Sequence, residues 1–373
     1  MKIVFILSSI ASVGGVQKVI VEKANWLSKR GHNVMLLTYE QGKHPCVYKL
    51  HSSIVHKDIN CRYFSLYNYN LIKRVIKARK MKKQFKKRYL QIIDNYQPDI
   101  VAAPTNTGKF LSEILSAKVK SHVVIVSHSA FEYDMMKGSP IKKLESIMIL
   151  HRLKRCDLLI ALTDGDASFW KKHVDNVRVV ANPVSFYQDK LEVTCSKRHR
   201  IICPARLHPQ KRLDRLIDAF SLIEKKHPTW YIDIFGEGPL KGQLIDKIRN
   251  LGLVNRVNIL PPTNNILMEY KKSQLFVLSS DFEGLPLTLL EAMASGVPCV
   301  SVSCPFGPSE VIVDGVTGLL AEMNVEDLAK KMDWMMTNEK KRIEMGKKAH
   351  QYSARFKEDI VMKQWEFAYK SVS

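Results

Sequence analysis

The feature that most constrains the fold is a regular alternation of short apolar runs with segments of helical periodicity. Six runs rich in Val, Ile and Leu lie in the first half of the chain, from KIVFIL to VRVVANP, and six lie in the second half, from RIICPA to TGLLAE. Strands that alternate with helices form parallel sheets, whose strands are apolar throughout because helices cover both faces. The pattern therefore predicts an α/β chain with two doubly wound domains in series.

A polar segment between the two series of strands marks the expected domain boundary. The stretch SFYQDKLEVTCSKRHR separates the last strand of the first series from RIICPA. We predict a first domain over residues 1–188, a second over residues 189–352, and a C-terminal helix over residues 353–373 that packs back on the first domain. The carboxyl ends of the strands of both domains are expected to present ligand-binding loops to a cleft.

The N-terminal segment and the cysteines indicate the cellular compartment in which the protein is expected. MKIVFILSSIASVGG imitates a secretory signal, but the helical pattern and the strand that follow it favour a buried first strand instead. No apolar run reaches the roughly 18 residues that a membrane span needs. Seven cysteines without a C-x-x-C pair favour reduced thiols over disulfides or a zinc site. We expect a cytoplasmic protein.

The net charge of +22 is concentrated in the first half of the chain. Residues 1–190 carry 32 Lys and Arg against 14 Asp and Glu, whereas residues 191–373 carry 26 against 22. This imbalance favours an anionic partner for the first domain, which could be a membrane surface, a phosphorylated acceptor or nucleic acid.

The strongest concentration of positive charge lies in LIKRVIKARKMKKQFKKRYLQII, residues 71–93, where ten cations occur without an acid. Its two apolar stripes do not line up, so we expect a bend or two helices. We predict that this segment rests on the anionic inner face of the cell membrane, where each cation contributes about 1 kcal/mol. No nucleic-acid-binding module is recognisable, which argues against nucleic acid. The cations are Lys73, Arg74, Lys77, Arg79, Lys80, Lys82, Lys83, Lys86, Lys87 and Arg88.

Two glutamates, Glu283 and Glu291, lie in the apolar stretch SSDFEGLPLTLLEAMASGVPCVS. The stretch predicts a strand, a turn and a helix that has Pro286 at its first position and ends at Gly296. The free N–H groups of such a helix start bind phosphate, and Glu291 is placed to accept hydrogen bonds from a ribose. The alternative, by spacing alone, is that both glutamates are exposed surface charges.

A second motif, CPARLHPQKRLDRLIDAF, places Arg206 just after a strand and Lys211 just before a helix. An arginine fork and a lysine charge suit a diphosphate. We interpret the neighbouring Arg212 and Arg215 as solvated charges, because the apolar face of the helix is formed by other residues.

These motifs, in this order, resemble those of the retaining family 4 glycosyltransferases of GT-B architecture. SVGGVQK, ARLHPQK, FGEGPL and the Glu283–Glu291 pair correspond to the motifs of that family. The resemblance implies that Arg206 and Lys211 bind the donor diphosphate, Glu283 the donor sugar and Glu291 the ribose. It further implies that the backbone of Gly284 and Leu285 caps the phosphate, that Gly14 and Gly15 close on the diphosphate, and that His128 contacts the transferred sugar.

The resemblance implies transfer with retention of configuration from a nucleotide-sugar, expected to be a UDP-sugar, to a glycan or lipid-linked acceptor. We expect Arg206, Lys211, Glu283 and His128 to be the catalytic residues, and no cofactor to take part. TDGD at 163–166 could hold a metal, but Asp164 as a helix N-cap explains the motif, so we predict no metal site. The alternatives are a non-catalytic protein that binds nucleic acid or anionic lipid, and a nucleotide-sugar epimerase of the same architecture.

Overall fold

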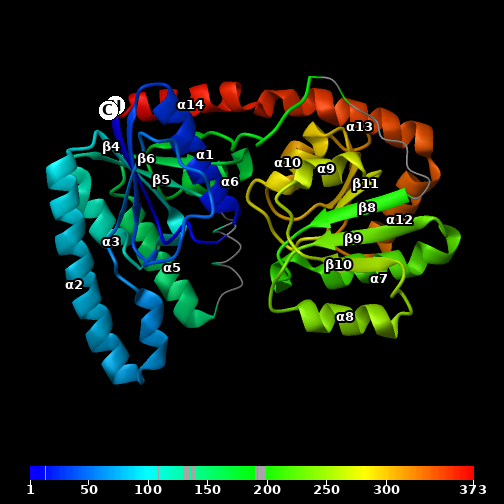
Figure 1. The fold of residues 1–373 in the computed structure, drawn as a ribbon, viewed down its shortest axis with the longest axis horizontal. Helices are drawn as coiled ribbons and strands as arrows, with labels where there is room; N and C mark the ends of the chain where they lie inside the picture. Colours follow the sequence, from blue (N-terminus) through cyan, green and yellow to red (C-terminus); the bar gives the residue numbers. More distant parts are fainter. Residues whose placement is uncertain are drawn as a thin grey trace. The chain divides into compact units, whose positions relative to one another are not determined.

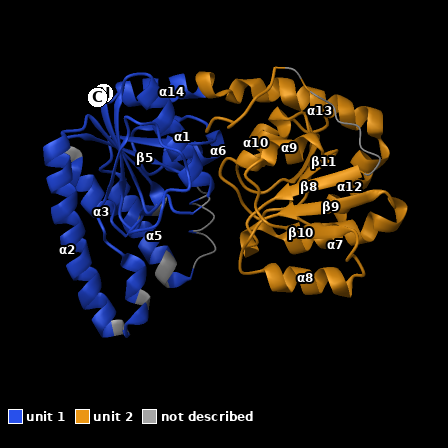
Figure 2. Cartoon of the chain, in the orientation of Figure 1, with its two compact units in different colours: residues 1–181, 361–373 blue, residues 182–360 orange. Residues whose placement is uncertain are grey.

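The computed structural model describes residues 1–373 apart from 13, 108, 129, 130, 132–134, 136–138, 190 and 192–198. The chain divides into two compact units, one formed by residues 1–181 and 361–373 and the other by residues 182–360 (Figure 2). Each unit contains its own parallel sheet and its own buried apolar cluster. The prediction of two doubly wound domains is therefore confirmed.

The sheet of the first unit has the strand order β3-β2-β1-β4-β5-β6-β7, and its strands pair in parallel. All of its predicted strands form, and β3 is an additional edge strand. The sequence gives little sign of β3, because VHKD is short, mostly polar and only partly buried. The strands are β1 (Lys2–Leu7), β2 (Asn33–Thr38), β3 (Val55–Asp58), β4 (Ile100–Pro104), β5 (His122–Val126), β6 (Leu158–Ala161) and β7 (Val177–Val179).

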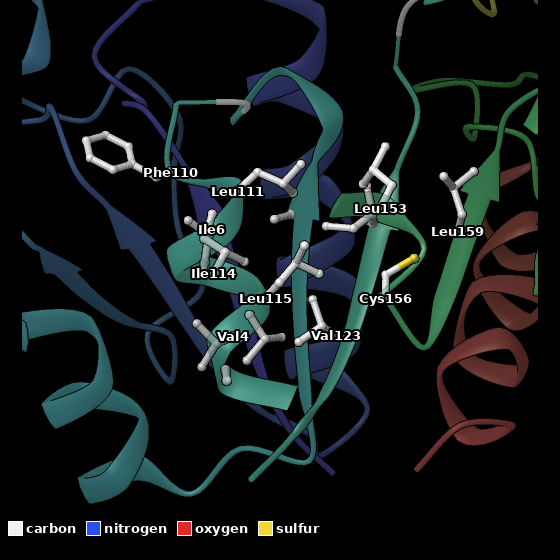
Figure 3. Close-up of a cluster of buried hydrophobic side chains, with 14 of the residues drawn as sticks. Val4, Ile6, Phe110, Leu111, Ile114, Leu115, Val123, Leu153, Cys156 and Leu159 are labelled. Atoms are coloured by element: carbon white, nitrogen blue, oxygen red, sulfur yellow. The ribbon is translucent and has the colours of Figure 1, made fainter. Parts of the chain in front are cut away.

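Helices connect these strands and cover the sheet (Figure 1). Val4 and Ile6 lie on one face of β1, two residues apart, and join the apolar cluster that contains Leu111, Ile114 and Leu115 (Figure 3). Each such side chain contributes about 1.5–3 kcal/mol when it is fully buried. The helices are α1 (Gly15–Lys29), α2 (Leu71–Tyr96), α3 (Leu111–Ile114), α5 (Pro140–Leu153), α6 (Asp164–Trp170) and α14 (Glu358–Lys370), with 3₁₀ turns at η1 (Tyr63–Asn68), η2 (Thr105–Thr107) and η3 (Leu115–Val119).

The basic segment forms one continuous helix, α2, so the predicted bend or break is wrong (Figure 1). Asn70 caps its start by accepting a hydrogen bond from the N–H of Lys73, and Gln97 ends it in the left-handed conformation. The two apolar stripes of α2 do not align because only one of them packs against the core. Phe85, Tyr89 and Ile93 are buried in the core, whereas Ile72, Val75 and Ile76 are exposed.

The sheet of the second unit has the order β10-β9-β8-β11-β12-β13 and is also parallel. Its chain order reverses between β8 and β11, and ligands of such sheets bind beside the carboxyl ends of the strands at this switch point. The strands are β8 (His199–Pro204), β9 (Trp230–Phe235), β10 (Val257–Leu260), β11 (Leu275–Leu278), β12 (Cys299–Val302) and β13 (Leu319–Ala321). The helices are α7 (Leu213–Ile223), α8 (Lys241–Asn250), α9 (Ile266–Lys271), α10 (Leu287–Ala294), α11 (Pro308–Val311), α12 (Val325–Thr337) and α13 (Glu339–Ser353), with 3₁₀ turns η4 (Pro209–Lys211), η5 (Glu224–Lys226) and η6 (Ala354–Phe356).

The division between the units falls after residue 181, earlier than the predicted 188, and the chain returns to the first unit at residue 361 rather than 353. The segment that begins at residue 182 belongs to the second unit because it packs on that unit's C-terminal helices. The N–H of Val184 donates to the carbonyl of Phe356 over 2.9 Å, and Tyr187 stacks on His350. Most of α14 packs on the first unit, where the indole N–H of Trp365 donates to the carbonyl of Ala181 over 2.7 Å.

Candidate functional site

The central feature of the site is an ion pair at the switch point of the second sheet. Lys211, the last residue of the 3₁₀ turn η4 between β8 and α7, donates from Nζ to Glu283 Oε1 over 2.7 Å, and Glu283 lies in the loop after β11. The hydroxyl of Ser280 donates to the same carboxylate oxygen over 2.6 Å. Glu283 is 7% exposed, so the alternative of an exposed surface charge is wrong for this residue.

The turn after Glu283 is fixed by a close approach of a second loop. Gly307, with a φ of +63°, lies so near that a Cβ atom there would come within 2.1 Å of the Gly284 carbonyl oxygen and 2.8 Å of Pro286 Cδ. Leu285 is buried. Pro286 is the N-cap of α10 rather than its first helical residue, because its ψ of 96° is extended. The backbone of Gly284 and Leu285 is thus held immediately before the start of a helix.

Glu291, the second glutamate of the motif, lies on α10 and is 5% exposed, so it is not a surface charge either. The hydroxyl of Tyr270 lies 3.3 Å from Oε2 and that of Ser185 lies 3.4 Å from Oε1. Burial, followed by the charge of Glu291, raises the pKa of Tyr270 well above its usual value, so Tyr270 remains a neutral hydrogen-bond donor. Gly296 ends α10 in the left-handed conformation, as predicted.

Arg206 is exposed and follows β8, as predicted, and no ion pair to its side chain is present within the described part of the chain. Its loop is held against the FGEGPL loop, which follows β9. A Cβ atom on Gly236 would lie 1.9 Å from the carbonyl oxygen of Ala205, and one on Gly238 would lie 2.4 Å from that of Leu207. The two glycines therefore allow the FGEGPL backbone to pack directly on the residues that flank Arg206.

Arg212 and Arg215, which follow Lys211 in the chain, are less exposed than the solvated charges that we expected. Arg215 is 4% exposed and paired with Asp281 over 2.7 Å, so the prediction is wrong for this residue. The helical pattern of α7 could not show this, because Asp281 is distant in sequence. Arg212 is partly exposed and pairs with Asp214 and Asp281.

In the first unit, Gly14 caps the start of α1 and Gly15 is its first residue. The hydroxyl oxygen of Tyr48 holds this glycine loop through two hydrogen bonds. This hydroxyl accepts from the N–H of Gly14 over 2.9 Å and donates to the carbonyl of Gly14 over 3.1 Å. Tyr48 was not predicted from the sequence, since nothing near it in the chain marks a contact with Gly14.

His128 follows β5 in the first unit, as predicted. Burial, and then the charge of nearby Lys23, lowers the pKa of His128 to about 3, so its imidazole is neutral at physiological pH. A neutral imidazole can both donate and accept a hydrogen bond, as a sugar hydroxyl requires. Gly15 and His128 belong to the first unit, whereas Arg206, Lys211, Glu283, Gly284, Leu285 and Glu291 belong to the second.

The cations of α2 form a surface together with exposed apolar side chains. Eight of the ten cations are exposed, and Arg74 and Lys82 are partly buried. At the η1–α2 corner, the exposed apolar residues are Phe64, Tyr69, Ile72, Val75 and Ile76. We call these five residues, with the cations of the first three turns of α2, the α2 tip. None of the described helices is both long and apolar enough to cross a membrane.

The TDGD motif begins α6, but its N-cap is Thr163 rather than the predicted Asp164. Thr163 Oγ1 accepts from the N–H of Asp166, and the buried Asp166 carboxylate accepts from the indole N–H of Trp170 over 3.0 Å. In the described residues, no group of three or more His, Cys, Asp or Glu side chains is placed to hold a metal ion.

The described cysteines are all free thiols, and Cys195 lies outside the described residues.

The two halves of the chain match two family models. Residues 13–186 match the model described as Glycosyltransferase Family 4, and residues 190–352 match the model described as Glycosyl transferases group 1.

Individual relatives differ in how much of their length the chain spans. An exopolysaccharide phosphotransferase of Streptomyces coelicolor is 36% identical over 222 residues, which are 58% of this chain and 24% of that protein. The chain thus spans about a quarter of that relative. A Campylobacter jejuni relative is 25% identical over 98% of this chain and 97% of its own length, and its name describes an N-acetyl-D-galactosaminyltransferase acting on a diNAcBac-PP-undecaprenol-linked glycan.

Among solved structures, HepE of Anabaena in complex with UDP and glucose is similar to the chain with a TM-score of 0.77. The sequences are 19% identical, and the match covers 100% of both chains. This likeness shows a common fold.

Proposed function

We propose that this chain, a glycosyltransferase of GT-B architecture with a Family 4 first half and a group 1 second half, transfers a sugar from a nucleotide-diphosphate-sugar. The proposed acceptor is a lipid-linked glycan at a membrane surface, and the sugar keeps its anomeric configuration. The observation that carries this proposal is the Lys211–Glu283 pair at the switch point of the second sheet. A sheet of this kind binds nucleotides at that point, and an ammonium group there suits a diphosphate.

The second unit supplies groups for each part of the donor. Lys211 and the exposed Arg206 neutralise the diphosphate, the backbone before α10 caps it, and Glu291 accepts from the ribose hydroxyls. Glu283 accepts from hydroxyls of the sugar. We propose a UDP-sugar as donor, since a protein of the same fold binds UDP and glucose.

The proposed reaction proceeds on one face of the sugar. The bond between the anomeric carbon and the diphosphate oxygen breaks, and its electron pair stays with the diphosphate. The acceptor hydroxyl oxygen bonds to the anomeric carbon on the same face, and its proton passes to the departing diphosphate oxygen. Lys211 and Arg206 stabilise the charge that develops on this oxygen, which is where positioned cations contribute most to the rate. His128 and Glu283 orient the sugar through hydrogen bonds.

The acceptor proposal rests on the α2 tip and on the Campylobacter relative, whose named substrate is linked to undecaprenyl diphosphate. Exposed isoleucines among lysines suit the boundary between lipid headgroups and acyl chains. The proposed location is therefore the cytoplasmic face of the membrane, with the acceptor held near it.

The test is a donor screen with the purified protein, a panel of UDP- and GDP-sugars, and undecaprenyl-diphosphate-linked glycans in detergent. Transfer with retained configuration, read by NMR of the product, supports the proposal. If none of the donors is used and neither UDP nor GDP raises the melting temperature at millimolar concentration, the non-catalytic binding protein becomes the better explanation. Interconversion of donor sugars without transfer would identify an epimerase.

We expect the α2 tip to control membrane binding. Ile72→Asn combined with Ile76→Asn should lower partitioning onto phosphatidylglycerol–phosphatidylethanolamine vesicles at least tenfold, because apolar surface no longer enters the interface. Lys73→Gln and Lys77→Gln should each cost about fivefold and weaken the salt dependence. The measurement is vesicle co-sedimentation.

A matched control for this prediction replaces exposed apolar side chains of the second unit, Leu222 and Val254, with Asn. These changes should leave vesicle binding as in the wild type. Unchanged binding of the Ile72/Ile76 variant would contradict the membrane proposal, and tight binding to duplex DNA rather than to vesicles would revive the nucleic-acid alternative.

A further inference from the structure

Arg215 lies beside the candidate site but outside the motifs that define it. It is the third residue of α7, and its side chain is 5% exposed. A buried guanidinium requires partners for its charge and its N–H groups. Arg215 donates from Nη1 to the carbonyl of Ser279 over 2.8 Å and from Nη2 to Asp281 Oδ1 over 2.7 Å.

These two bonds lie on either side of Ser280. Ser280 in turn donates to the Glu283 oxygen that also accepts from Lys211. The guanidinium therefore holds the backbone carbonyl of Ser279 and the side-chain carboxylate of Asp281, on either side of the residue that orients the Glu283 carboxylate. Its planar fork can make both bonds in one geometry, which a lysine ammonium at the end of a flexible chain cannot.

Further bonds tie the same two loops together. The N–H of Asp281 donates to the carbonyl of Gln210, and the Gln210 amide donates to the carbonyl of Phe282, both over 2.9 Å. The hydroxyl of Ser279 donates to the carbonyl of Lys211 over 2.9 Å. Each bond joins the segment that carries Lys211 to the segment that carries Glu283. Among these contacts, Arg215 and Asp281 supply a charge pair, in which Arg215 is buried and Asp281 is partly exposed and also pairs with Arg212.

We propose that Arg215, through Asp281, is a positioning residue that holds the loop of residues 279–283 so that Glu283 and Lys211 meet the donor in one fixed arrangement. The inference rests on the proposed function for its catalytic consequence. Its structural consequence, a loop that is ordered by Arg215, does not depend on which substrate is used.

The test compares Arg215→Met, which keeps the length but loses both bonds, with Arg215→Lys. Amide hydrogen exchange over residues 279–284 should become at least tenfold faster in Arg215→Met, with exchange in β9 unchanged. Transfer, measured as kcat/KM for the donor, should fall roughly 10²-fold, because a small displacement of positioning groups has that effect. The KM for the donor should rise, and Arg215→Lys should lie between Arg215→Met and the wild type.

Arg249→Met is the matched control, since Arg249 forms an exposed pair with Asp246 on α8 and should leave exchange and transfer unchanged. Wild-type exchange and wild-type transfer in Arg215→Met would overturn the inference, as would faster exchange spread evenly over residues 199–360. If Arg215→Met does not fold, the same readouts decide on Arg215→Lys and Asp281→Asn. Faster exchange at 279–284 in a protein that transfers no sugar would support the positioning role while the proposed function fails.

Discussion

Lys211→Ala should lower transfer, measured as kcat/KM for the donor, by roughly 10²–10³-fold. The ammonium group lies at the switch point of the second sheet, where the proposed leaving diphosphate gains negative charge as its bond to the sugar breaks. A fixed cation at that position stabilises the transition state more than the ground state, so kcat should fall as well as the affinity for the donor. Arg206→Ala and Glu283→Ala should each also abolish most transfer without unfolding the protein.

The same substitution also removes a structural ion pair, and the two effects can be separated. Without Lys211, the buried Glu283 carboxylate still accepts a hydrogen bond from the Ser280 hydroxyl, and the protein should lose about 1–3 kcal/mol of stability. Lys211→Met combined with Glu283→Gln replaces both charges and should recover much of that stability while transfer stays low. Full transfer in Lys211→Ala would rule out the diphosphate role of Lys211.

The parts of this site that could be predicted from the sequence are those marked by local pattern. A strand, a turn and a helix start place Arg206, Lys211 and Glu283 at the carboxyl ends of two strands, and parallel strands bring those ends to one edge of the sheet. The burial of Glu291 and its contact with Tyr270 could not be read in this way. The local sequence pattern of a glutamate within a helix is the same whether its side chain is exposed to solvent or packed against another element.

Contacts between residues distant in sequence explain most of the errors. Arg215 falls on the polar side of the α7 pattern, and only its pairing with Asp281 shows that it is buried. Apolar stripes that do not align predict a bend or a break, but α2 continues unbroken because one stripe packs in the core while the side chains of the other are exposed. Periodicity alone cannot distinguish these cases, because it shows which side chains share a face and not what that face contacts.

A second large effect is expected for the stability of the first unit, from Lys23 on α1. Lys23 is 1% exposed, and its Nζ lies 3.1 Å from the centre of the Trp365 ring. Burial lowers the pKa of Lys23 well below 10.5, and the charge of Glu22 opposes this shift only in part. The folded protein therefore loses the Lys23 proton at a lower pH than the unfolded chain does, so charged Lys23 costs free energy of folding.

Lys23→Met should raise the free energy of unfolding, by a margin that narrows as the pH rises. Between the lowered pKa of folded Lys23 and 10.5, the unfolded chain binds one proton more than the folded protein, so wild-type stability increases with pH in that window. The slope is about 1.4 kcal/mol per pH unit, and Lys23→Met lacks this contribution. Urea unfolding of both proteins from about pH 7 to about pH 10 measures the margin.

The control is Lys29→Met, an exposed lysine on the same helix, which should show a small margin that does not change with pH. The charge of Lys23 also contributes to the lowered pKa of His128, so Lys23→Met should raise that pKa, as followed by NMR of the imidazole. A margin independent of pH would mean that the contact of charged Lys23 with Trp365 offsets its burial, and a Lys23→Met variant less stable than the wild type at neutral pH would mean that the contact outweighs it.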